Sequence, residues 1–217
     1  MNSINKILES EKPAKWLFCG DSITHGVYHT FGMHDYVQIF EARVRWELKR
    51  YTDIVIRTAT TNWTTQSILD NIEWCILQFQ PDVVSLMIGM NDANCLTLDQ
   101  FIDNYHQILD IIKSKTKSEI IIHTPNTIIP NSDTRREQEL PAIVEEIRAI
   151  GKEYNLMVID HYAEYSKART DDPRRTYSWM SDSIHPNVMG HKAFARLIFK
   201  ELNIWDENTQ VFWTLIP

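Results

Sequence analysis

The sequence predicts an α/β protein in which a mainly parallel sheet of five strands carries helices on both faces. Short apolar runs alternate along the chain with segments of helical periodicity. Strands are expected near residues 15–19, 53–58, 82–88, 118–124 and 156–160. Because two parallel neighbours must be joined by a long crossover, which is usually a helix, this alternation favours a parallel sheet.

Helices are expected where apolar residues recur at intervals of three and four. The segments with this spacing are 37–48, 68–76, 101–112, 143–150 and 193–198. Thr97 and Gln100 form a capping-box pattern ahead of the third segment. Gly151 closes the fourth segment, and Pro141 blurs its start.

Residues 1–217 are expected to form one domain, because no repeat, low-complexity segment or long linker divides the chain. The tail, residues 205–217, is unusually apolar for a chain end. An apolar patch of that kind promotes aggregation if it stays exposed to solvent. We therefore expect the tail to dock on the domain or on a partner, and a homodimer contact is one arrangement that would cover it.

The net charge of −7 argues against a nucleic-acid partner, because no basic excess exists to neutralise phosphates. Short basic pairs such as Arg135-Arg136 are expected to be solvated surface. No stretch approaches the length of a membrane span, and residues 1–15 lack the apolar region of a secretory signal. The three cysteines suggest no disulfide framework. We therefore expect a cytoplasmic protein without a membrane or nucleic-acid partner.

The serine in Gly20-Asp21-Ser22-Ile23-Thr24 follows the first predicted strand. A serine at a strand end, beside a glycine that permits a tight turn, is typical of an exposed nucleophile in an α/β fold. Such a hydroxyl needs a base to take its proton and a group to orient that base. Asp182 and His185, in Asp182-Ser183-Ile184-His185, supply both types within one turn of chain. Taken alone, each motif is most often a turn or a helix cap.

Asn91 changes that balance, because Gly89-Met90-Asn91-Asp92 comes directly after the third predicted strand. An amide at the carboxyl end of a parallel strand can face the negative charge that develops near Ser22. Three such motifs, two of them at strand ends, favour a serine hydrolase.

These residues resemble the SGNH (GDSL-type) hydrolase family in three of its four blocks, over most of the chain. The resemblance implies a flavodoxin-like three-layer α/β/α sandwich and esterase chemistry without cofactor or metal. By the family pattern, Ser22 is the nucleophile, His185 the base and Asp182 its partner. The N–H of Ser22 and the side chain of Asn91 are then two oxyanion donors.

The second block departs from the family pattern, because Asn62 stands where a glycine that supplies a third oxyanion N–H is expected. Asparagine enters the left-handed backbone region more readily than most residues. We therefore expect Asn62 to keep the glycine's geometry and its N–H to remain a donor. The alternative is that the loop has moved and only two donors remain.

The predicted substrate is a short-chain acyl ester, with an acetylated carbohydrate favoured. Trp63 and Trp179 lie close in sequence to Asn62 and His185, and their faces could hold a sugar ring. Simple core packing is the alternative for both. The loop 125–136 is long enough to form a pocket wall.

Two other functions stay open: a lysophospholipase or thioesterase of the same family, and a non-catalytic binding module on this fold. A metal site among His25, His29 and His34 is not expected, because their spacing matches no zinc signature.

Overall fold

The structure, a computed structural model, describes residues 3–26 and 28–211. Its sheet consists of β1 (Lys15–Gly20), β2 (Ile54–Arg57), β3 (Val83–Met87), β4 (Glu119–Thr124) and β5 (Met157–Asp160). All neighbouring strands are parallel, and their spatial order is β2-β1-β3-β4-β5. This is the flavodoxin-like order, so the predicted fold class and all five strands are confirmed.

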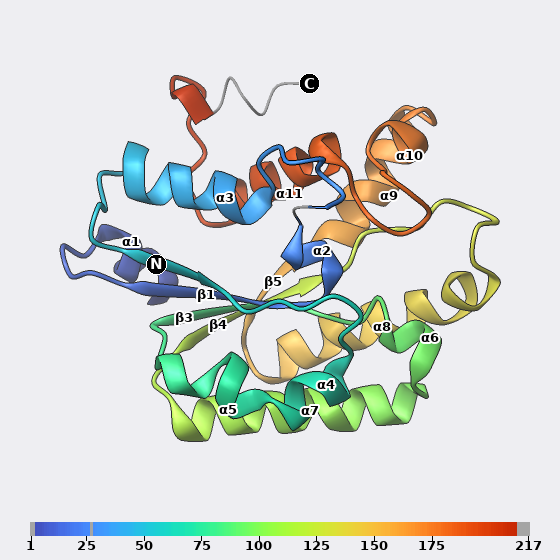
Figure 1. Cartoon of the computed structure of the whole chain (residues 1–217), viewed down its shortest axis with the longest axis horizontal. Helices are drawn as coiled ribbons and strands as arrows, with labels where there is room; N and C mark the ends of the chain where they lie inside the picture. Colours follow the sequence, from blue (N-terminus) through green and yellow to red (C-terminus); the bar gives the residue numbers. More distant parts are fainter. Residues whose placement is uncertain (1–2, 27, 212–217) are drawn as a thin grey trace.

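Helices cover both faces of the sheet (Figure 1). One layer contains α3 (Tyr36–Glu41), its π-helical continuation (Ala42–Glu47), α9 (His161–Asp171) and α11 (Val188–Glu201). The opposite layer contains α4 (Thr65–Asp70), α5 (Ile72–Cys75), α7 (Leu98–Lys115) and α8 (Thr134–Glu153). Short helices complete the described chain: α1 (Ser3–Glu9), α2 (Ser22–His25), α6 (Asp92–Cys95), α10 (Arg175–Ser178) and a 3₁₀ turn (Leu77–Phe79).

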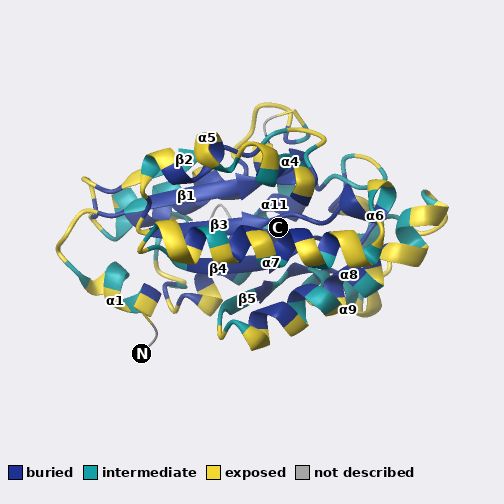
Figure 2. Cartoon of the chain, turned by 90° about the horizontal axis from the view of Figure 1, so that it is seen from below, coloured by how far each residue is buried: buried dark blue, intermediate teal, exposed yellow. Residues whose placement is uncertain are grey.

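The sequence pattern explains which strands are central. Residues 16–20 of β1 and all of β3 are buried, which is why these segments are continuous apolar runs rather than alternating ones. The helices turn their buried sides to this sheet and their exposed sides to solvent, as Figure 2 shows for α7 and α8.

Three helices differ from the prediction. The segment 37–48 changes from α to π geometry at Ala42, and the segment 68–76 breaks at Asn71. Pro141 lies inside α8, which begins seven residues before it. Asp133 explains that early start, because its side chain accepts a hydrogen bond from the N–H of Arg136 and caps the helix.

The first part of the predicted docking tail, residues 205–211, is described. Trp205 and Val211 are partly buried against the core, and the Lys200 ammonium lies 5.7 Å from the Trp205 ring centre. The N–H of Val211 donates to Glu47 at 2.7 Å. The rest of the tail, residues 212–217, lies outside the described residues.

Candidate active site

The sheet order places Ser22 and Asn91 at the point where connections leave the sheet in opposite directions. β1 and β3 are neighbours, and Ser22 comes two residues after the end of β1 and Asn91 four residues after the end of β3. In open parallel sheets this switch point forms the crevice where ligands bind. The structure therefore brings together two residues that are 69 positions apart in the sequence.

Ser22, His185 and Asp182 form a continuous chain of hydrogen bonds. Ser22 Oγ lies 2.8 Å from His185 Nε2, and His185 Nδ1 lies 2.8 Å from Asp182 Oδ2. An ionised carboxylate can only accept, so Nδ1 carries the ring proton and Nε2 is left as the acceptor for the Ser22 hydroxyl. This tautomer is the one that a general base requires.

The loop that carries Asp182 and His185 is closed by its own backbone. Oδ1 of Asp182 accepts hydrogen bonds from the N–H groups of Ile184 (2.9 Å) and His185 (2.8 Å). The N–H of Ser181 donates to the His185 carbonyl at 2.8 Å. Partial burial opposes ionisation, but these N–H groups and the imidazole outweigh it and hold the pKa of Asp182 below its usual value.

Ser22 is the first residue of α2, where a helix has no internal acceptor for its N–H. Asp21 caps this helix by accepting from the N–H of Ile23 at 2.9 Å. Burial raises the pKa of Asp21 to about 7. Gly20 is required here, because a Cβ would lie 2.2 Å from the carbonyl oxygen of Met87 on β3.

Asn91 is held in one orientation by contacts at both ends of its amide. Its Nδ2 donates to the Trp63 carbonyl at 3.0 Å, and its Oδ1 accepts from Arg136 Nη2 at 3.3 Å. Turning the Asn91 amide by 180° would place its NH₂ group against the Arg136 guanidinium and its oxygen against the Trp63 carbonyl. The second Nδ2 hydrogen has no acceptor among the described residues.

Arg136 was expected to be solvated, and this expectation was wrong. Its side chain is partly buried and, besides Asn91, it donates to the Met90 carbonyl (Nε, 3.0 Å) and pairs with Asp133 (2.5 Å). Nothing in its sequence neighbourhood distinguishes it from Arg135, which is exposed.

Asn62 has a φ of +66°, so its backbone adopts the left-handed conformation expected of a glycine substitute. It occupies an exposed turn closed by a hydrogen bond from the N–H of Trp63 to the Thr60 carbonyl. Within the described chain, the N–H of Asn62 has no hydrogen-bond acceptor.

Comparison with known proteins agrees with this geometry. A model of the GDSL-like lipase/acylhydrolase family matches residues 18–193, which include Ser22, Asn91 and His185. The chain belongs to this family. Membership makes it an SGNH-type serine hydrolase that acts on ester bonds.

Two curated proteins resemble this GDSL-family chain. An acetylxylan esterase from Geobacillus stearothermophilus is 24% identical over 207 residues, which cover 87% of this chain and 93% of that protein. An uncharacterised protein from Mycoplasma pneumoniae is 31% identical over 140 residues. That match covers 60% of this chain but only 16% of the Mycoplasma protein.

Solved structures share the GDSL-family fold. A putative GDSL-like lipase from Parabacteroides merdae superposes with a TM-score of 0.78 at 20% identity, covering 89% of this chain and 97% of that one. The Geobacillus acetylxylan esterase superposes with a TM-score of 0.74 at 23% identity, covering 91% and 97%.

The two tryptophans predicted to face the substrate do not line the pocket at Ser22. Trp179 is buried and packs edge-on against Tyr165, while the Arg175 guanidinium lies 5.5 Å from its ring centre. Trp63 is half-buried and packs edge-on against Trp74. Both rings therefore make the packing contacts that were the alternative to sugar binding.

The pocket at Ser22 has a volume of about 360 Å³ and is lined instead by the segment that follows the serine. The lining residues are Ser22, His25, Gly26, Tyr28, His29 and Thr61.

His29, which the sequence analysis considered only as a metal ligand, contacts the proposed base. Its ring stacks on His185 with centres 3.6 Å apart and planes 8° from parallel, and its Nδ1 lies 3.4 Å from Asp182 Oδ2. Burial, with the neighbouring His185, lowers the pKa of His29, although Asp182 opposes the shift. His29, Asp182 and His185 are also close enough to suggest a metal cluster. However, a metal lies in the plane of each imidazole that binds it, and parallel rings 3.6 Å apart share no such position.

Asp92 connects the loop after β3 to the start of α4. Its Oδ1 accepts from the N–H (2.9 Å) and hydroxyl (2.6 Å) of Thr65. Burial raises the pKa of Asp92, and these hydrogen bonds partly offset the increase.

In the described part of the chain, no helix is both long and apolar enough to span a bilayer.

Proposed function

We propose that this GDSL-family hydrolase cleaves a short-chain acyl ester through an acyl-serine intermediate, and that its substrate is an acetylated carbohydrate. The observation that carries this proposal is the hydrogen-bonded chain from Ser22 through His185 to Asp182, with Nε2 left as the proton acceptor.

The reaction has two steps. Ser22 Oγ attacks the carbonyl carbon of the ester while its proton passes to His185 Nε2. The tetrahedral intermediate collapses, and the leaving alcohol takes that proton. A water molecule then attacks the acyl-serine with His185 again as base, which releases the carboxylic acid and restores the Ser22 hydroxyl.

The proposed oxyanion donors are the N–H of Ser22, the free Nδ2 hydrogen of Asn91 and the N–H of Asn62. Each donor that faces the developing charge contributes on the order of a hundredfold or more to turnover. The orientation of Asn91 and the positive φ of Asn62 support these roles.

The pocket beside Ser22, of about 360 Å³, is the proposed site of the acyl group. The 24% identical acetylxylan esterase supports an acetyl group on a carbohydrate. A lysophospholipase or thioesterase would require an apolar channel for its acyl chain.

Ser22→Ala tests the assignment. We expect kcat on 4-nitrophenyl acetate to fall by roughly three orders of magnitude or more, because no other described side chain occupies the position next to His185 Nε2. An organofluorophosphonate probe should label the wild type and leave Ser22→Ala unlabelled. His34→Gln, which changes an exposed residue of the same segment, is the control.

The acyl preference is tested with nitrophenyl esters from acetyl to octanoyl. We expect kcat/KM to decrease with chain length, and a preference for octanoyl would refute the acetylesterase assignment while leaving the serine mechanism intact.

A further inference from the structure

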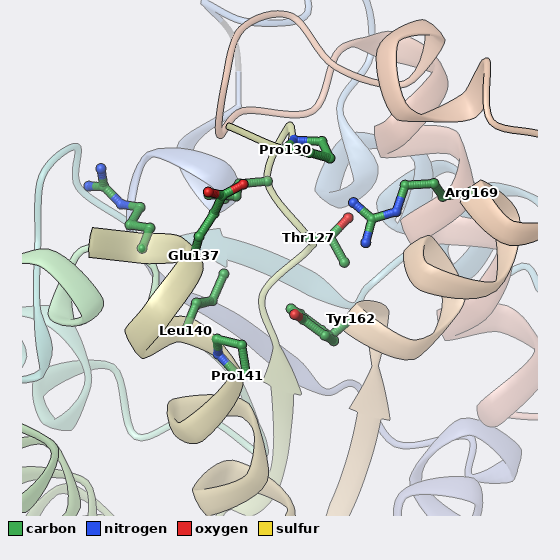
Figure 3. A pocket seen from close by; sticks show the side chains of 9 residues that line it. Thr127, Pro130, Glu137, Leu140, Pro141, Tyr162 and Arg169 are labelled. Atoms are coloured by element: carbon green, nitrogen blue, oxygen red, sulfur yellow. The ribbon is translucent and has the colours of Figure 1, made fainter. Parts of the chain in front are cut away.

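A second cavity lies between α8, α9 and the loop after β4, and its volume is about 280 Å³. Figure 3 shows Glu137 on one side and Arg169 on the other, with the ring of Tyr162 below them. The remaining lining residues are Thr127, Ile128, Pro130, Arg136, Leu140 and Pro141. The cavity thus has an apolar floor with an aromatic ring and a polar upper part.

Three hydrogen bonds connect the surroundings of this cavity to the proposed catalytic centre. Arg136 lines the cavity and donates to Asn91. The loop behind the cavity is bonded to the segment before His185: the N–H of Ile129 donates to the Ser183 carbonyl at 2.9 Å, and Asn126 Nδ2 donates to the Ile184 carbonyl at 3.0 Å. One residue of the cavity wall thus contacts Asn91, and the loop that carries three other lining residues is bonded to the segment before His185.

Two polar side chains of the cavity lack partners within the protein, whereas the Glu137 carboxylate accepts a hydrogen bond from the N–H of Asn131. Arg169 and Tyr162 are half-buried, yet the guanidinium and the phenol have no hydrogen-bond or ion-pair partner among residues 3–26 and 28–211. Pro141 has no N–H, so the carbonyl oxygen of Glu137, four residues earlier in α8, lacks its helical donor. Polar groups left in this state favour a ligand that supplies both donors and acceptors.

The charged side chains of the cavity favour a neutral ligand over an anionic or a cationic one. Asp133 neutralises Arg136, which leaves one cation (Arg169) opposite one anion (Glu137). An anionic ligand would meet the Glu137 carboxylate, and a cationic ligand would meet the guanidinium. Neighbouring hydroxyl groups satisfy both, because each hydroxyl donates and accepts.

We propose that this cavity, formed by Glu137, Tyr162 and Arg169, is a sugar-binding subsite that holds a neutral pyranose unit of the acylated carbohydrate. The Tyr162 ring and Pro141 contact the apolar face of the sugar, and Arg169 and Glu137 bind adjacent hydroxyls. The volume is slightly below the range of about 300–1,000 Å³ typical of small-molecule sites and suits a single ring. This subsite replaces Trp63 and Trp179 as the carbohydrate contact, and it rests on the proposed function.

The experiment compares two substrates of the same enzyme: a partially acetylated xylo-oligosaccharide and 4-nitrophenyl acetate, which has no sugar. Arg169→Gln and Tyr162→Ala should each lower kcat/KM on the oligosaccharide about tenfold, as expected for a lost charged hydrogen bond or ring contact. Both variants should keep kcat/KM on nitrophenyl acetate within about twofold, which also shows that they fold. Lys167→Gln removes a positive charge from the same helix outside this cavity and should match the wild type on both substrates.

Equal losses on both substrates, or no loss on the oligosaccharide, would overturn the subsite. A binding measurement adds a second readout: unacetylated xylotriose should bind Ser22→Ala protein and bind at least about tenfold more weakly when Arg169→Gln is added. Wild-type protein that neither hydrolyses nitrophenyl acetate nor reacts with a fluorophosphonate would instead refute the proposed function.

Discussion

Arg136 contributes to the orientation of the Asn91 side-chain amide. An amide can present either its oxygen or its hydrogens to a ligand, and only hydrogens stabilise an oxyanion. The contact of Arg136 with Asn91 Oδ1, together with the Trp63 carbonyl at Nδ2, fixes the useful orientation.

Arg136→Met, which keeps the length of the side chain, is therefore expected to lower kcat on nitrophenyl acetate about tenfold with little change in KM. In an Asn91→Ala background the same substitution should cause no further loss, because the group that it orients is absent. Arg135→Met is the control. Equal losses in both backgrounds would show that Arg136 acts in some other way.

Asn62 provides a second test at this scale. Glycine adopts a φ of +66° without strain, whereas a β-branched residue at this φ raises the free energy of the folded state. Asn62→Gly should retain turnover of nitrophenyl acetate, whereas Asn62→Val should reduce kcat on the order of a hundredfold if the N–H is a donor. Equal activity of the two variants would remove Asn62 from the oxyanion site.

At the scale of elements, α3 fixes the end of the segment that carries His29. Asp35 is fully buried and caps α3 by accepting from the N–H groups of Val37 and Gln38. Both of its oxygens also lie 2.7 Å from the guanidinium of Arg57, the last residue of β2. The segment after Ser22 is thereby tied to the sheet edge.

Asp35→Ala should lower the free energy of unfolding by roughly 3–5 kcal/mol, because it leaves Arg57 without its partner in a largely buried position. Thr97→Ala removes an exposed cap from α7 and should cost about 1 kcal/mol. Urea unfolding measures both. Similar losses in the two variants would mean that the Asp35–Arg57 pair contributes little beyond the cap.

At the scale of the whole molecule, buried histidines couple stability to pH. Burial lowers the pKa of His123 to about 3 and of His191 to about 4, and it also lowers the pKa of His161. An unfolded histidine has a pKa near 6.5. Below that pH the unfolded chain binds more protons than the folded one, so acid destabilises the fold.

Asp21 and Asp92 act in the opposite direction, because burial raises their pKa values and the folded state then holds the extra protons. With three histidines against two carboxyls, the free energy of unfolding should fall as the pH is lowered from about 6 to about 4.5. Asp21→Asn should make this fall steeper, and His34→Gln should leave it unchanged. Stability that is constant or rises over this range would contradict the prediction.

The sequence by itself determined the strands, their order along the chain and the residues at their ends. Burial of apolar runs and the turn after a strand are local properties, so Ser22 and Asn91 could be placed at strand ends without a structure. Asp182 and His185 were found for the same reason, because they are three residues apart.

Only the tertiary structure decided which other side chains reach the site. His29 and Arg136 have ordinary sequence surroundings, and their contacts with His185 and Asn91 join elements far apart in the chain. Trp179 shows the converse, because it lies six residues before His185 yet points into the packing around Tyr165. A residue's type and position state what it can contact, but the direction of its side chain depends on how the helices pack against the sheet.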